Sequence, residues 1–143
     1  MSRNPRTQGS SRASEELDIL LHHAEAFRYA SLLHLYRFLC RFSTETYQPK
    51  MAECVESIMA HVSCIPLNFH CELGLVFPLF MIGIADHRPE TTGYVWNRLD
   101  NIFNWTKFEH VLRARSLLET LWDTGRTDWE QVLQELGWQI SIA

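Results

Sequence analysis

The segment Leu73–Ile84, with the sequence LGLVFPLFMIGI, is the longest apolar run in the chain. At about a dozen residues it is too short to cross a bilayer, which takes about 20 residues. We therefore predict a buried central helix and no membrane contact, with the helix beginning at Asn68, a good cap, and ending near Ile84. A proline inside a helix kinks its axis. Pro78 thus predicts a kinked central helix, and Gly83 predicts close contact with a neighbouring helix.

Apolar residues spaced three and four apart predict further helices on both sides of this run. Ser14 and the acids that follow it are typical of a helix start, and this first helix should run to about Phe42. After a connection over Thr44–Pro49, a second helix is predicted from the apolar stripe Met51, Val55, Ile58 and Val62. Three more helices are predicted after the central one: from Pro89 to near Asn104, from Thr106 to about Thr124, and from Trp129 to Leu136, where Gly137 ends the last helix. No segment alternates with period two. The sequence predicts an all-α bundle of five to six helices.

The first 14 residues differ in composition from the rest of the chain. They are polar, contain Arg3, Arg6 and Arg12, and lack any acid. Such a segment buries too little apolar surface to offset the entropy of ordering, so residues 1–14 are predicted to be a disordered basic tail. The remaining residues, 15–143, are predicted to form a single helical domain, because a chain of 143 residues with 46% hydrophobic content is long enough to hold one core.

The charge is divided unevenly between these two parts. The whole chain carries −4 and the tail +3, which leaves −7 on residues 15–143. Nucleic-acid binding needs a basic surface that contacts phosphates, so we expect no direct nucleic-acid contact from the folded part. The first apolar cluster, near Leu17, is interrupted by Asp18 and His22, unlike a secretory signal. We expect the chain to be nuclear or cytoplasmic.

The cysteines and histidines show no spacing typical of a metal or redox site. The four cysteines, Cys40, Cys54, Cys64 and Cys71, lie too far apart for a zinc ribbon, and we expect reduced thiols in the core. His61 and Cys64 are one helical turn apart, but a buried thiol is the simpler interpretation. We predict no metal and no cofactor.

No catalytic signature is present in the chain. The neighbouring acids and histidines, such as Asp86 with His87, are expected to be solvated or to cap helices. The arginines and lysine of the fourth and fifth helices are interleaved with acids, which is typical of a solvated face; they are Arg98, Lys107, Arg113 and Arg115. The five tryptophans are expected mainly in the core and at helix junctions. The sequence favours a protein that is not an enzyme.

An ordered set of spaced residues resembles the C-terminal part of the fungal-specific transcription factor domain, the helical regulatory region of fungal zinc-cluster transcription factors. These residues are Phe77 to Phe80, Gly83, Asp86, Val95 to Leu99, Leu117 to Glu119, Trp122, Asp128-Trp129 and Gly137-Trp138. The resemblance spans roughly residues 17–143. It implies a nuclear setting and, often, a role near metabolic or secondary-metabolite gene clusters. The six clustered cysteines of the zinc-cluster DNA reader do not precede Cys40, so we do not expect DNA binding of that kind.

From this resemblance we expect a regulatory helical domain that acts by protein contact or small-molecule sensing. A chain that keeps only the last part of the longer family domain leaves apolar helix faces uncovered, which favours a protein partner or a homodimer. A hydrophobic small molecule is the other expected ligand, bound at an apolar and aromatic site between the central helix and the fourth and fifth helices. The predicted ligand-binding residues are Phe77, Phe80, Trp96, His110 and Trp122.

Two alternatives remain open at this stage. The first is a small stand-alone biosynthetic protein of fungal secondary metabolism that reuses the module to bind or cyclise a hydrophobic intermediate. Its only candidate proton donors or acceptors are His70, His87 and His110. The second is a structural dimerisation module, for which the apolar first helix is the main evidence.

Overall fold

The computed structural model describes residues 5–137 and confirms the all-α fold, because these residues contain helices and no strand. None of the described helices is both long and apolar enough to cross a membrane. The elements are α1 (Pro5–Leu39), α2 (Thr44–Ser63), the short 3₁₀ helix η1 (Glu72–Leu75), α3 (Val76–Ala85), α4 (Pro89–Thr106), α5 (Glu109–Thr124) and α6 (Trp129–Leu136).

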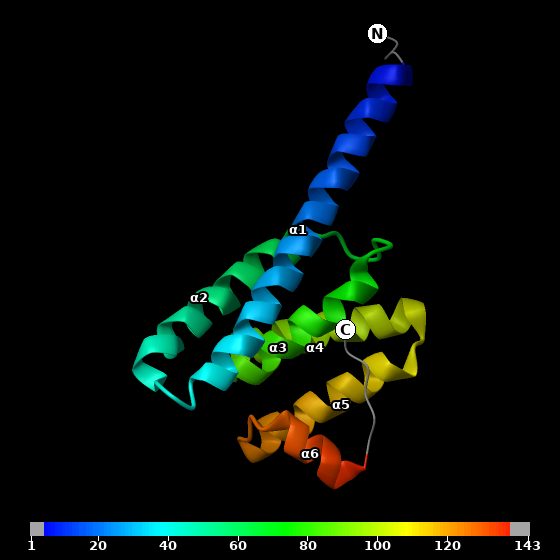
Figure 1. The fold of residues 1–143 in the computed structure, drawn as a ribbon. Coiled ribbons are helices and arrows are strands. Elements are labelled where there is room, and N and C mark those ends of the chain that lie inside the picture. The colour runs from blue at the N-terminus through cyan, green and yellow to red at the C-terminus, as the bar shows by residue number, and fades with distance from the viewer. Residues whose placement is uncertain (1–4, 138–143) are drawn as a thin grey trace.

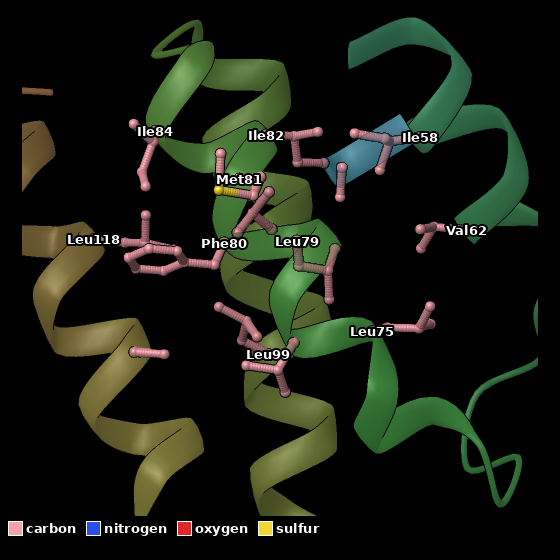
Figure 2. Close-up of a cluster of buried hydrophobic side chains, with 14 of the residues drawn as sticks. Ile58, Val62, Leu75, Leu79, Phe80, Met81, Ile82, Ile84, Leu99 and Leu118 are labelled. Atoms are coloured by element: carbon pink, nitrogen blue, oxygen red, sulfur yellow. The ribbon is translucent and has the colours of Figure 1, made fainter. Parts of the chain in front are cut away.

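Helix α3 is the centre of the molecule, in contact with α1, α2, α4 and α5 (Figure 1). Eight of its ten residues are buried, as the apolar run predicts. Its side chains project in several directions, with Ile82 towards Ile58 of α2 and Phe80 towards Leu118 of α5 (Figure 2). A helix that is apolar on all sides has to be enclosed by other helices. The surrounding four helices provide that enclosure.

The start of the central helix differs from the prediction. Asn68 does not cap it, because Asn68 has a left-handed backbone with φ of 64° and precedes a turn. The helix α3 begins at Val76, which places Pro78 in its first turn. The first N–H groups of a helix have no partner inside it, so a proline there removes no hydrogen bond. This position of Pro78 does not require the predicted kink.

Other helix boundaries follow from local caps. The Ser43 hydroxyl accepts a hydrogen bond from the backbone N–H of Thr46, so α2 begins at Thr44 and contains Pro49, where a connection was expected. Pro89 begins α4, and the left-handed Gly125 and Gly137 end α5 and α6, all as predicted.

Helix α1 already includes Pro5, upstream of the start expected at Ser14. Its end at Leu39 falls short of Phe42. The proposed division of the chain into a tail over residues 1–14 and a domain over residues 15–143 stays a prediction.

Gly83 sits where α3 meets α5, and its role in close packing is confirmed. A Cβ at this position would lie 3.0 Å from Leu118 Cδ2 and 3.3 Å from Trp122 Cζ2. The Trp122 indole N–H also donates to the Gly83 carbonyl at 2.7 Å. The absence of a side chain therefore lets α5 approach the α3 backbone closely enough for this hydrogen bond.

A buried ion pair fixes the loop that enters α3. The Glu72 carboxylate is fully buried and accepts a 2.8 Å hydrogen bond from Arg98 Nε, while Arg98 Nη2 donates to the Ile65 carbonyl at 2.7 Å. Three further donors reach Glu72, namely the Asn68 backbone N–H, Asn101 Nδ2 and Trp105 Nε1. The expectation of a solvated Arg98 is wrong, because this side chain is only 7% exposed and neutralises an internal carboxylate.

A candidate cleft beside the end of helix α1

A cleft of about 780 Å³ opens where the end of α1, the start of α2, the end of α3 and the α5–α6 connection meet. Its volume is in the range of small-molecule sites. The lining residues are Ser31, His34, Leu35, Arg37, Phe38, Cys40, Arg41, Thr44, Gln48, Met51, Ile84, Ala85, Thr127, Asp128 and Glu130.

The chain forms this cleft by turning sharply between two helices. Helix α1 ends at Leu39, and the Phe42 backbone N–H bonds back to the Leu39 carbonyl at 2.9 Å. Ser43 then caps α2, whose first turn returns along the cleft. The end of α3 supplies Ile84 and Ala85 at the bottom. Three separate helix ends therefore converge at one hollow.

Two arginines give the α1 side of the cleft a positive charge. Arg37 Nη2 donates to the Thr127 carbonyl at 2.5 Å, and burial lowers the pKa of the Arg37 guanidinium. The Arg41 guanidinium lies over the Phe38 ring at 5.4 Å. Across the cleft, Asp128 is already paired with Arg126, with Nη2 and Oδ2 2.6 Å apart. Glu130 also lines the cleft and attracts the Arg37 guanidinium, so Arg41 is the cation left for an anionic group.

The rest of the cleft is apolar and polarisable. Leu35 and Phe38 are 48% and 51% exposed, which is high for residues of their size. Cys40 Sγ and Met51 Sδ lie 3.3 Å apart on the neighbouring wall. Thioether and thiol groups adapt to irregular apolar shapes. The arrangement suits an amphipathic occupant that has one acidic group and an apolar body.

The five predicted ligand-binding residues lie elsewhere, and none of them lines this cleft. Phe80 is fully buried and packs edge-on against Trp129, with the ring centroids 5.3 Å apart. Phe77 is half-buried and contacts Phe27 of α1. His110 stacks on Phe108 beside the start of α5. These three side chains are not brought together, and their role in binding stays a prediction.

The other two predicted residues do meet. The rings of Trp96 and Trp122 lie 6.5 Å apart, and the Arg115 guanidinium lies 4.4 Å from the Trp96 ring centroid. Arg115 also pairs with Asp100. Because the Trp122 indole N–H already donates to Gly83, the pair serves first as a junction between α3, α4 and α5.

Histidines and cysteines are distributed without a metal site among residues 5–137, where no group of three suitable side chains comes together. His22 and His61 share a 2.9 Å contact between their Nδ1 atoms, and burial lowers the pKa of the nearby His23. Asp86 accepts hydrogen bonds from the Arg88 backbone N–H and the Thr91 hydroxyl, but no side-chain hydrogen bond caps α4.

The cysteine prediction is partly wrong. The described structure contains four free thiols, but only Cys54 is buried and Cys64 is exposed. Burial raises the pKa of the Cys54 and Cys71 thiols. Cys64 is the C-cap residue of α2, and this position keeps it near the surface instead of in the core.

Sequence reasoning missed both the cleft and the buried ion pair. The Glu72–Arg98 pair had a signal, because each charge interrupts an otherwise apolar helical face beside residues such as Val76 or Val95. The cleft had none, since its walls come from segments as far apart as Ser31 and Glu130.

The fold therefore defines a helical domain whose outer features are a long first helix with exposed apolar side chains and a cleft lined by charged and apolar residues. The family model of the fungal specific transcription factor domain matches residues 2–143, and the chain belongs to this family. Comparison with curated proteins and with solved structures gave no match.

Proposed function

We propose that the chain is a regulatory module of transcription control that acts through contact with another protein and does not read DNA itself. Membership of the family supports the regulatory role. The charge of −7 on residues 15–143, from −4 overall and +3 on residues 1–14, opposes contact with a phosphate backbone. The proposal includes a nuclear location and the control of secondary-metabolite genes, as the family resemblance implies.

Exposed apolar side chains on α1 support the protein contact. Leu17 and Leu21 are 57% and 55% exposed, and Leu35 and Phe38 continue the same helix into the cleft. Large apolar side chains grouped on one helix are unusual on a surface that faces only water. This grouping is the single observation that carries the proposed mode of action.

A tethering experiment tests this function. The full chain is fused to an unrelated DNA-binding domain upstream of a reporter gene in a fungal cell, and we expect reporter output to change. The double variant Leu35→Glu/Phe38→Glu should lose the effect. The matched control is Leu67→Glu, which alters a 58% exposed leucine outside this face and should retain it. A reporter that does not respond to the wild-type fusion would overturn the regulatory role.

The expected lack of DNA binding is tested separately. Fluorescence anisotropy with a labelled duplex at low salt should show no binding by the chain, since an acidic surface repels phosphates. Binding that weakens steeply as salt is added would contradict the proposal that the chain does not bind DNA.

A second candidate function, small-molecule sensing, is favoured by the volume and chemistry of the cleft. The probe 1-anilinonaphthalene-8-sulfonate has an anionic sulfonate that suits Arg41 and an apolar body that suits Phe38. We expect its fluorescence enhancement to fall in Phe38→Ala and to persist in Trp96→Phe. The reverse result would favour the aromatic site predicted from the sequence. The biosynthetic alternative would place a hydrophobic intermediate at that aromatic site, between α3 and the helices α4 and α5, and product formation in a reconstituted pathway would support it.

A further inference from the structure

The first half of α1 stands clear of the other helices (Figure 1). Here Leu17, Leu20 and Leu21 are 57%, 43% and 55% exposed. An isolated amphipathic helix is marginal in water and takes most of its stability from packing of its apolar face. A covering surface is therefore needed if this half of α1 is to persist.

The exposed positions of α1 form one continuous seam. Seven exposed residues alternate at spacings of four and three, namely Leu17, Leu21, Ala24, Arg28, Ser31, Leu35 and Phe38. This repeat of 3.5 residues is the spacing by which one helix packs along another. The seam is apolar at both ends and has small side chains, Ala24 and Ser31, near its middle. Such a pattern fits a second long helix better than it fits a globular surface.

The uneven charge along α1 as a whole favours one partner and one direction. The segment 15–25 contains Glu15, Glu16, Asp18 and Glu25 and no lysine or arginine. The segment 26–41 contains Arg28, Arg37 and Arg41 and no acid. Two antiparallel copies of α1 would place each acidic half beside a basic half, whereas parallel copies would place like charges together.

One antiparallel register brings together the apolar ends of the two seams and the oppositely charged segments of α1. With Arg28 near the two-fold axis, Leu17 of one copy lies opposite Phe38 of the other. The same register places the acidic segment 15–18 of one copy beside the basic segment 37–41 of the other. Each Arg28 already pairs with its own Glu25 at 2.7 Å, which offsets the repulsion between two arginines at the axis.

The register also supplies an occupant for the cleft. Leu35, Arg37, Phe38 and Arg41 form its α1 wall, so the acidic and apolar first half of the partner's helix would enter it. We infer that this chain forms a two-fold symmetric dimer in which antiparallel α1 helices exchange their first halves into each other's clefts. Such an interface uses the same surface on both copies and closes on itself. This inference names the partner of the proposed protein contact.

The molecular mass of the full chain tests the dimer directly. Light scattering after size exclusion, over a range of concentrations, should give twice the chain mass of 16.8 kDa at the higher end. The variant Leu17→Glu/Leu21→Glu should be monomeric and lose helical circular dichroism, whereas the control Leu67→Glu should remain dimeric. A mass of one chain at every concentration, or a dimer unaffected by Leu17→Glu/Leu21→Glu, would overturn the inference.

Charge reversal tests the antiparallel direction. The acidic and basic segments meet twice in a symmetric dimer, so Glu15→Arg or Arg41→Glu alone should weaken dimerisation about tenfold. The double variant Glu15→Arg/Arg41→Glu should restore it. Two single variants with unchanged affinity, or a double variant weaker than either, would rule out this register. The mass measurement is independent of the reporter, so a dimer that does not affect the reporter would refute the regulatory function alone.

Discussion

Two ion clusters hold two loops of this molecule, and they differ in burial. Glu72 and Arg98 tie the loop before α3 to α4, and their side chains are 0% and 7% exposed. Arg126, Asp128 and Glu135 tie the α5–α6 connection to α6, and their side chains are 36%, 51% and 49% exposed. The bond lengths are similar, with 2.8 Å in the first cluster and 2.6 and 2.9 Å in the second.

Because the bond lengths are similar, we expect burial to decide how strongly each ion cluster fixes its loop. Removing one partner of a buried pair leaves an unpaired charge out of water, whereas an exposed pair is screened and easily replaced by solvent. The entry to α3 is therefore fixed, while the exposed cluster adds little to the α5–α6 connection, which is also held by the Arg37 bond to the Thr127 carbonyl.

The largest effect is expected from Glu72→Ala, which removes a fully buried carboxylate and leaves Arg98 without its partner. We expect a loss of about 3–5 kcal/mol in the free energy of unfolding. Urea denaturation followed by circular dichroism measures it, with Glu135→Ala as the exposed control. Equal losses for the two variants would contradict the importance of burial.

Gly83→Ala tests the close approach of α5 to α3. The added methyl group would press on Leu118 and Trp122, and such overpacking costs about 1–3 kcal/mol. Alanine recovers up to about 1 kcal/mol as a better helix former. We expect a net loss of about 1–2 kcal/mol by the same measurement. A gain in stability would show that α5 moves away from α3 to accommodate the methyl group at little cost.

The Asp86–Arg88 ion pair depends on pH, and the burial of its carboxylate lies between those of the two clusters, because the Asp86 side chain is 11% exposed. Hydrogen bonding from Arg88 lowers the pKa of Asp86 to about 2, although burial opposes the shift. A depressed carboxyl pKa stabilises the fold above the unfolded value of 3.8, and this contribution is lost as the pH falls towards 2. We expect Asp86→Asn to cost about 1–2 kcal/mol at neutral pH and almost nothing near pH 2. A cost that does not change with pH would exclude this linkage.

The sequence predicted those parts of the fold that depend on neighbours along the chain. Gly125 and Gly137 end helices because a left-handed residue needs no distant partner. The Glu72–Arg98 bond and the cleft could not be predicted in this way, since they join residues far apart in the sequence. Pro78 shows the same limit, because its effect depends on where α3 begins, and that start depends on the turn fixed through Glu72.

Pro78→Ala tests this placement. A proline inside a helix costs about 3 kcal/mol, so its removal from a kinked interior would stabilise the protein by a similar amount. In the first turn of α3 we expect a change below about 1 kcal/mol, because no hydrogen bond is regained and the unfolded chain gains freedom. Urea denaturation distinguishes the two cases, and a large gain in the free energy of unfolding would support the predicted kink at Pro78.

The smallest effect on global stability is expected from Arg126→Ala in the exposed cluster. Removing this guanidinium frees Asp128 and Glu135, but both carboxylates are already solvated, so the denaturation midpoint should stay within experimental error. The local effect should be larger, because the α5–α6 connection then keeps only the Arg37 bond to the Thr127 carbonyl as a tether. Hydrogen exchange measured by mass spectrometry should therefore speed up around Thr127 and leave α3 unchanged. Faster exchange in α3 as well would show that the two clusters are coupled, and that the weakly held side of the cleft is part of the same cooperative unit as the core.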